Sequence, residues 1–293
     1  MNSIQFFGAI ELGLIYALVA LGVYLTFRAI NFPDLTVDGS FPLGAAVAAA
    51  LIVNGTHPVL ATLAAFMAGG IAGFVTGFLT VRWKILGLLS GILTMTALYS
   101  INLRIMGRPN IAIMNESTIF TLMTDTQDQR FYIIIGVTVL VTVLLWGFLS
   151  SQIGLALRGV GINPRVCPAY GISVGKLTLV GLMISNGMVS LGGALFAQAH
   201  GFADVSLGTG TLITGLASVI IGESIFHRGN ILVILLSVIL GSILYRIFIA
   251  LALNTQFTGL QASDLNLITS LLVVFAMLLP QIRKSFQKYR QSL

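Results

Sequence analysis

Long apolar runs separated by short polar segments dominate the hydropathy pattern of this chain. A helix that crosses a bilayer needs about 20 mostly apolar residues. Nine runs predict membrane-embedded helices, with eight to ten as the open range: Phe6–Phe27, Pro42–Val53, Pro58–Val81, Ile85–Leu103, Phe131–Leu149, Leu177–Ala197, Leu207–Ile225, Ile231–Leu253 and Leu265–Gln281. We therefore expect an all-α polytopic membrane protein, with residues 1–293 forming one transmembrane domain.

The second run is too short to cross a bilayer on its own. It follows the polar stretch NFPDLTVDGS, and residues 30–53 therefore read as a broken or re-entrant segment. Backbone that is not helical at membrane depth is tolerated where it is buried in protein or lines a cavity. This segment is the first candidate for something other than a simple span.

Composition supports the membrane assignment and excludes several functions. Charged residues make up 8% of the chain, against about 25% in soluble domains. The net charge is +6, but the basic residues are scattered at the ends of apolar runs, and nucleic-acid binding needs a clustered basic face. One cysteine excludes an intramolecular disulfide, and the three histidines lack metal-ligand spacing. We expect no metal site and no catalytic residues.

Lysine and arginine predict the orientation, because cytoplasmic loops carry an excess of both. With the N-terminus outside, eleven of the fifteen basic residues fall inside and three outside. The inner set is Arg28, Arg82, Lys84, Arg158, Arg165, Lys176, Arg228, Arg283, Lys284, Lys288 and Arg290. The C-terminal run RKSFQKYR then lies in the cytoplasm, where it suits contact with lipid headgroups.

An internal repeat appears when the chain is shifted by 170 residues. Ala17–Val37 then lies over Gly187–Leu207, with seven of 21 positions identical, and both copies contain F-x-D-[LV]-[ST]. Five predicted spans separate the copies, so the second is inverted. The expected halves are residues 6–149 and 177–281, joined by a cytoplasmic loop over 150–176. Inverted repeats are typical of transport folds.

Each copy carries an aspartate and a hydroxyl residue just before an apolar segment. Asp34 and Thr36 precede Pro42–Val53, and Asp204 and Ser206 precede Leu207–Ile225. Their side chains suit helix capping, because short polar side chains accept from the first free backbone N–H groups of a helix. A role as a gate or in a pathway is compatible with capping and is the sharper hypothesis.

The loop over residues 150–176 contains more helix-start and helix-end signals than a plain connector needs. Asn163 followed by Pro164 predicts a helix start, and Gly171 a left-handed helix end. Pro168 is awkward inside so short a helix. The residues proposed for docking a partner are Asn163, Pro164, Arg165, Pro168, Tyr170 and Gly171.

Three stretches carry a resemblance to a known family: TFRAINFPDLTVDGSFPLGAAVAA, NPRVCPAYGIS, and the run from LMISNGMVSLGGALFAQ to GFADVSLGTGTLITGLASVIIGES. In this order they resemble the permease subunit of ABC-type uptake transporters, in the branched-chain amino acid/ribose class. The similarity is greatest to the branch encoded beside a tryptophan/tyrosine-type binding protein, and it covers most of the chain.

The resemblance implies a set of partners and a location. The N-P-R…Y-G element would be the coupling helix that fits a groove of the ATP-binding subunit, which binds ATP and Mg²⁺; this chain itself has no GxxxxGK[ST] motif and is not expected to be an enzyme. A periplasmic or lipid-anchored solute-binding protein, a homodimer, an amino acid as solute and the bacterial inner membrane are also implied.

Some residues keep two interpretations. Asn186 lies in a span that the family places near the pathway, and its side chain suits either a solute or interhelical bonding. Arg246 suits snorkelling to the interface or pairing with Glu11. The alternative functions are an ion-coupled secondary transporter, which would also have inverted repeats, and a non-transporting scaffold.

Overall fold

Seven helices are long and apolar enough to cross a membrane in the part of the chain that the computed structural model describes, residues 3–114, 116–123, 127–226, 229–254 and 274. The first span joins α1 (Ser3–Val23) to the π-helical η1 (Tyr24–Ile30), and the sixth joins the 3₁₀ turn η3 (Val205–Gly208) to α9 (Thr211–Ile225). The others are α3 (Pro58–Trp83), α4 (Gly87–Met106), α6 (Gln127–Ser150), α8 (Val174–His200) and α10 (Ile231–Asn254).

The predicted short run belongs to α2 (Val37–Val53), which begins five residues earlier than expected. Its 17 residues span about 26 Å, less than the bilayer core. The predicted run Leu265–Gln281 lies outside the described residues. Seven of the nine predicted runs therefore correspond to possible spans, and the count of nine is not confirmed.

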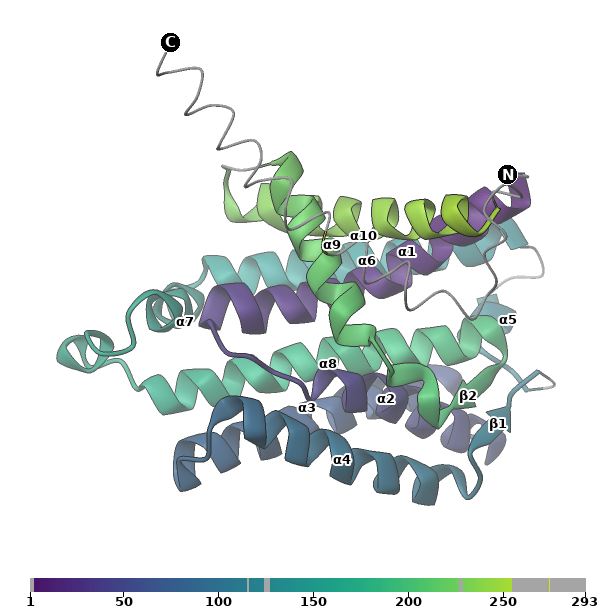
Figure 1. Cartoon of the computed structure of the whole chain (residues 1–293). Coiled ribbons are helices and arrows are strands. Elements are labelled where there is room, and N and C mark those ends of the chain that lie inside the picture. The colour runs from purple at the N-terminus through teal and green to yellow at the C-terminus, as the bar shows by residue number, and fades with distance from the viewer. Residues whose placement is uncertain (1–2, 115, 124–126, 227–228, 255–273, 275–293) are drawn as a thin grey trace, which may run out of the picture.

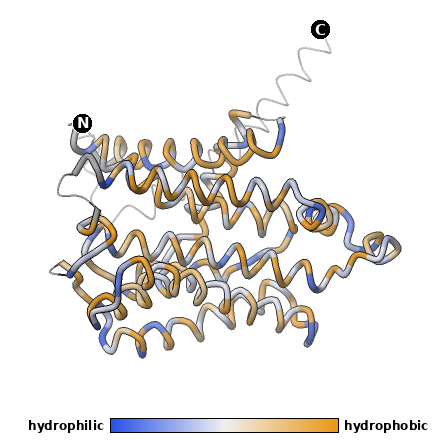
Figure 2. Tube along the Cα trace, turned by 180° about the vertical axis from the view of Figure 1, so that it is seen from behind, coloured by the Kyte–Doolittle hydropathy of each residue, from blue (hydrophilic) through white to orange (hydrophobic). Residues whose placement is uncertain are grey.

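Most of these helices run roughly along one common direction, whereas α9 crosses them obliquely and α2 lies inside the bundle (Figure 1). The 11-residue helix α7 (Gln152–Ile162) lies at one end, and the short elements β1 (Asn110–Ala112), β2 (Phe202–Asp204) and α5 (Ile119–Met123) lie at the other. We call these the α7 end and the strand end. Hydrophobic positions fill the helices, and hydrophilic ones gather toward the two ends (Figure 2).

Close packing of α2 against α8 forms the centre of the bundle. A methyl group at Gly44 would collide with the carbonyl oxygen of Ser190, and one at Gly193 would collide with that of Phe41. Small residues at such positions let backbones approach, which drives helix association in membranes. The sequence of α2, with its alanines and glycines, thereby explains how a helix can be enclosed on all sides.

The α2 helix begins abruptly after an irregular stretch. Asn31, with φ of 57°, ends η1 in the left-handed conformation that asparagine tolerates. Residues 31–36 then lead inward, and α2 starts at Val37. Pro42 lies inside α2 and cannot donate to the carbonyl of Asp38. The segment predicted as broken, residues 30–53, is therefore non-helical from Asn31 to Thr36 and helical from Val37 onward.

The loop over Arg104–Arg130, which is outside in the predicted orientation, contributes β1, and the segment between α8 and α9 contributes β2; these are the only strands of the described residues. The strands pair antiparallel, with Asn110 opposite Asp204 and Ala112 opposite Phe202. The pairing joins the loop to the segment between α8 and α9, and so fixes where that segment turns back into the bundle.

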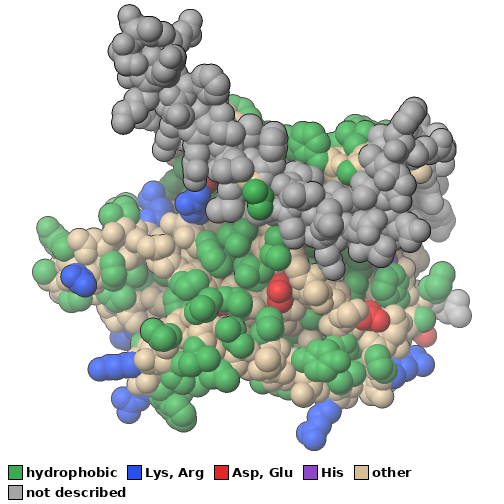
Figure 3. Space-filling view, in the orientation of Figure 1, with side chains coloured by type: hydrophobic (Ala, Val, Ile, Leu, Met, Phe, Trp, Pro, Cys, Tyr) green, Lys and Arg blue, Asp and Glu red, His purple; other side chains and the backbone are tan. Residues whose placement is uncertain are grey.

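Basic residues are unequally distributed between the two ends. Lys and Arg side chains lie toward the margins of the face seen in Figure 3, whose centre is largely hydrophobic. The described residues at the α7 end are Arg28, Arg82, Lys84, Arg158, Arg165 and Lys176, and those at the strand end are Arg104, Arg108 and Arg130.

The two copies of the proposed repeat lie at opposite ends of α4. Phe32 packs against Gly87 at the start of α4, whereas Ala203 and Val205 cluster with Met106 at its end. Both copies form the same local turn, in which an aspartate accepts a hydrogen bond from the backbone two residues later. An inverted repeat requires both features, but the repeat itself stays a prediction.

Candidate functional site

The N-termini of α2 and α9 meet inside the bundle. The backbone N–H of Leu212, in the first turn of α9, donates to Asp38 Oδ1 at 2.7 Å, and Asp38 belongs to the first turn of α2. Gly208, in η3, packs so closely on the Asp38 carbonyl that a side chain would not fit. A carboxylate from one broken segment thus caps the helix of the other, which stabilises the positive end of α9.

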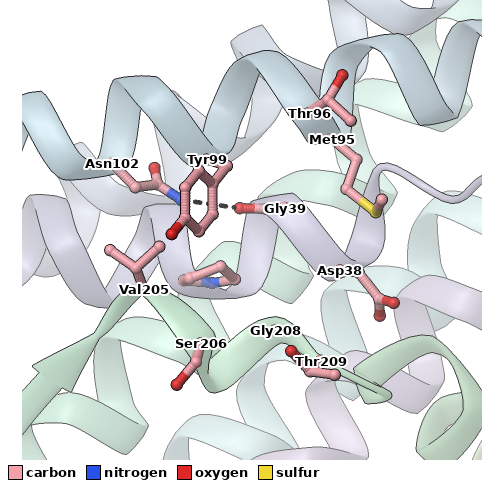
Figure 4. Close-up of a pocket in the computed structure, with 11 residues that line it drawn as sticks. Asp38, Gly39, Met95, Thr96, Tyr99, Asn102, Val205, Ser206, Gly208 and Thr209 are labelled. Carbon is pink, nitrogen blue, oxygen red and sulfur yellow. Dashed lines mark hydrogen bonds between the residues drawn. The ribbon is translucent and has the colours of Figure 1, made fainter. Parts of the chain in front are cut away.

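A cavity of about 360 Å³ opens beside this junction, between α2, α4 and η3 (Figure 4). Its lining combines an apolar majority with several polar groups: Asp38, Gly39, Pro42, Met95, Thr96, Tyr99, Asn102, Val205, Ser206, Gly208 and Thr209. Such a mixture is usual for small-molecule sites, which are mostly apolar with a few placed polar groups. The cavity is therefore the best candidate for a solute site among the described residues.

Three of the predicted pathway residues meet in a buried network between α2, α3 and α8. Asn186 Nδ2, on α8, donates to Asp34 Oδ2 at 2.7 Å, and the Thr36 backbone N–H donates to Asp34 Oδ1 at 2.9 Å. The hydroxyls of Thr36 and Thr76 hydrogen-bond at 2.7 Å, and Ser40 Oγ donates to Asn186 Oδ1 at 2.7 Å. The side chains are fully buried, so this network joins helices inside the chain and leaves no surface for a solute.

The other two pathway candidates lie at the strand end. Asp204 is the N-cap of η3 and accepts from the Ser206 backbone N–H at 2.7 Å and from the Ser206 hydroxyl. Asn110 Nδ2, on β1, donates to Asp204 Oδ2 at 3.2 Å. The Ser206 hydroxyl, first, and the backbone N–H hold the pKa of Asp204 below its ordinary value, because they stabilise the charged form. Ser206 also lines the cavity.

Capping, predicted for both pairs, occurs in a different form. Asp204 caps η3, and α9 begins at Thr211 rather than at Leu207. The N-cap of α2 is Thr36, whose side chain makes no capping bond. The residue that caps α9 is Asp38, which the sequence analysis missed. Its signal was an acidic residue next to an apolar run, which is expensive in a membrane and therefore deserves a functional hypothesis.

The docking loop has a different shape from the one predicted. The α-helix of this region, α7, ends before Asn163, which is its C-cap, and Pro164 does not begin a helix. Asn163 Oδ1 instead accepts from the Arg165 backbone N–H at 3.2 Å. A 3₁₀ turn, Cys167–Tyr170, follows, and Pro168 fits its start because no partner is needed for a backbone N–H there.

Gly171 ends this turn with φ of 72°, the left-handed conformation that was predicted. Arg165, Pro168 and Tyr170 are exposed, and Tyr170 retains 77% of its accessible surface. Ile162 and Val166 are exposed beside them. The loop therefore presents a basic, aromatic and aliphatic surface at the α7 end.

Two arginines make contacts that were not predicted from the sequence. Arg246 lies over the ring of Tyr16, 3.7 Å from its centroid, and forms no ion pair with Glu11. Arg28, in η1, forms an ion pair with Glu223, in the last turns of α9. Among the described residues, no group of three or more His, Cys, Asp and Glu residues is placed to hold a metal ion.

Comparison with known proteins gives these elements a family. Residues 5–280 match the family described as the permease component of branched-chain amino acid transport systems. The tyrosine transport system permease protein of Clostridioides difficile is 41% identical over 261 residues, covering 89% of this chain and 86% of that protein.

More distant relatives extend the picture. The ribose import permease protein of Escherichia coli is 23% identical, over 73% of this chain and 67% of its own length. The solved structure of PsaBC from Streptococcus pneumoniae in complex with Fab has the same fold, with a TM-score of 0.53 and 17% identity over 93% of this chain and 89% of that one. The chain therefore belongs to the branched-chain amino acid/ribose class of permease subunits of ABC-type uptake transporters.

Proposed function

We propose that this chain is the membrane-spanning subunit of an ATP-driven importer that moves an amino acid, delivered by an extracytoplasmic binding protein, into the cytoplasm. The observation that carries the proposal is the meeting of α2 and α9 beside a cavity inside the bundle. Transporters commonly place their site where two broken helices begin. The amino acid class is supported by the relative that is named for tyrosine transport.

The loop at the α7 end docks the ATP-binding subunit in this proposal. Asn163, Pro164, Arg165, Pro168, Tyr170 and Gly171 form the docking surface, and ATP with Mg²⁺ binds to the partner. The exposure of Tyr170, Ile162 and Val166 supports this role, because exposed aromatic and aliphatic side chains next to an arginine are typical of interfaces.

The orientation follows from the distribution of basic residues. The α7 end, with more described lysines and arginines than the strand end, faces the cytoplasm of a bacterial inner membrane. The N-terminus is then outside and the C-terminus inside. Two copies of the chain pair as a homodimer, and the binding protein docks at the strand end.

Reconstitution in proteoliposomes tests the whole proposal. The permease, its ATP-binding subunit and a binding protein loaded with radiolabelled amino acid are combined, and uptake is measured. We expect uptake with ATP on the side of the ATPase and none with a non-hydrolysable analogue. Uptake driven by a sodium or proton gradient, without the ATPase, would instead establish a secondary transporter.

A charge reversal in the loop tests the docking surface separately. Arg165→Glu is expected to reduce ATP-driven uptake at least about tenfold, since a buried interfacial charge reversal costs several kcal/mol. Arg82→Glu is the matched control, because Arg82 is exposed at the same end, outside the loop. Equal uptake by the two variants would contradict the docking role of residues 163–171.

A further inference from the structure

The cavity between α2, α4 and η3 carries an unbalanced negative charge. Among the described residues that line it, Asp38 is the one charged residue, and no lysine, arginine or histidine joins it. At membrane depth a single charge is weakly screened, so it biases the whole cavity toward ligands of opposite sign. The lining therefore selects by charge as well as by shape.

Asp38 retains capacity for a further ligand while it caps α9. A carboxylate offers about four acceptor positions. The Leu212 N–H takes one. Asp38 is partly exposed, in contrast to Asp34, which is completely buried. Of the two carboxylates in this region, Asp38 is the one that a solute in the cavity can reach.

The remaining walls suit the body of an amphipathic solute. Tyr99, on α4, is 56% exposed, and its ring lies toward α2 in the cavity (Figure 4). A tyrosine face attracts an ammonium group and also packs against apolar groups. Met95 and Pro42 add apolar surface. The Thr96 hydroxyl donates to backbone carbonyls of its own helix and the Ser206 hydroxyl donates to Asp204, so the oxygens of both remain as acceptors for a donor on a solute.

A second polar side chain at this wall also favours a hydrogen-bond donor. Asn102 Nδ2 donates to the Gly39 carbonyl at 3.4 Å, which fixes the amide orientation, because the opposite one would place two acceptors face to face. Its Oδ1 is then a buried acceptor without a partner among the described residues. Buried polar groups normally have at least one hydrogen-bond partner.

We propose that this cavity is the intramembrane subsite for a solute that bears an ammonium group, and that Asp38 is the residue that recognises that group. The inference rests on the proposed function and adds to it the charge class of the solute and the residue that recognises that charge. The same carboxylate ties α2 to α9, so solute recognition is placed at the joint between the two broken segments.

Thiol modification tests the charge of the cavity without any transport. Thr96→Cys is made in a Cys167→Ser background, since Cys167 is the one native cysteine. The rate of thiol modification is measured for a cationic and for an anionic methanethiosulfonate of similar size. The cation-to-anion ratio of these rates is then divided by the same ratio measured for mercaptoethanol. With Asp38 present, we expect the normalised ratio to favour the cation about tenfold. With Asp38→Asn, it should fall to within about twofold of mercaptoethanol.

Asparagine is the informative substitution, because its side-chain oxygen still accepts from Leu212 while the charge is lost. Glu116→Gln is the matched control, since Glu116 is an exposed carboxylate in the outer loop, outside the cavity. It should leave the ratio unchanged. An equal ratio with and without Asp38, or the absence of modification by both reagents, would overturn the proposal.

Transport by the same variants separates this inference from the proposed function. In the full assembly, Asp38→Asn should reduce uptake of an ammonium-bearing amino acid about tenfold, whereas Glu116→Gln should transport normally. Normal ATP-driven uptake by Asp38→Asn would reject the role of Asp38 and leave the importer assignment standing. Failure of the wild-type assembly to transport would reject the importer assignment, and the modification ratio would still report on the cavity.

Discussion

Asp34 is a fully buried carboxylate whose described hydrogen bonds come from neutral groups. Its position just before α2 also places it near the positive end of that helix. Burying a charge is costly unless it is hydrogen-bonded, so each donor matters more here than at the surface. The network around Asn186 is therefore best understood as the attachment of α2 to α8.

Removing the amide of Asn186 tests this reading. Asn186→Ala should lower the free energy of unfolding by about 3 kcal/mol, because it removes one of the charge-assisted hydrogen bonds to the buried Asp34 carboxylate and leaves Oδ2 without its donor. The measurement is unfolding by sodium dodecyl sulfate in mixed micelles. Asn54→Ala is the control, since Asn54 is exposed and bonds only to the Ala50 carbonyl of its own helix among its described contacts. A similar effect of both substitutions would contradict the assignment.

At the residue scale, the sequence singled out polar side chains but did not predict which residues they contact. Asp34, Thr36 and Asn186 were singled out as polar residues next to or within apolar spans. Their meeting could not be predicted, because Asp34 and Asn186 are 152 residues apart and only the packing of α2 on α8 joins them. Asp38 was missed because its capping partner, Leu212, belongs to the other half of the chain.

At the scale of elements, the spacing between helices depends on residues that have almost no side chain. Gly44→Ala should destabilise the protein by about 2 kcal/mol, since the new methyl group would collide with the Ser190 backbone and force α2 from α8. Gly136→Ala, in α6, has open space around it and should be neutral or stabilising by up to about 1 kcal/mol. Thermal unfolding in detergent distinguishes them, and equal melting temperatures would contradict the packing.

The long helices were predictable because continuous apolar runs of bilayer length have few other solutions. The start of α2 was placed at Pro42, where the apolar run begins, whereas the helix begins five residues earlier, within the polar stretch, and tolerates Pro42 inside it. Helix α7 was missed because Gly154, Gly159 and Gly161 weaken its helical pattern. Two of these glycines are required by close contacts, Gly154 with Leu149 and Gly161 with Ala29.

For the whole molecule, the predicted orientation in the membrane decides whether the docking surface at residues 163–171 faces the cytoplasm. In a Cys167→Ser background, Tyr170→Cys should react with a membrane-impermeant maleimide in inverted vesicles and not in spheroplasts if the α7 end faces the cytoplasm, as we propose. Met114→Cys, at the strand end and 82% exposed, should react in the opposite preparation. Labelling of position 170 from outside would reverse the assignment of both ends.

The packing of α8, α9 and α10 shows how the sequence halves are distributed in space. Helix α8 packs against α2 and α3, which precede it by more than 90 residues, whereas α9 and α10 pack against α1. Helix α9 is also held at its start by Asp38 and near its end by Arg28, both from the first half. Helices of the two sequence halves are interleaved in space, so neither half can move as a separate rigid body. If a rocking motion exposes the cavity to alternate sides of the membrane, each of the two moving parts must therefore contain helices from both halves of the sequence.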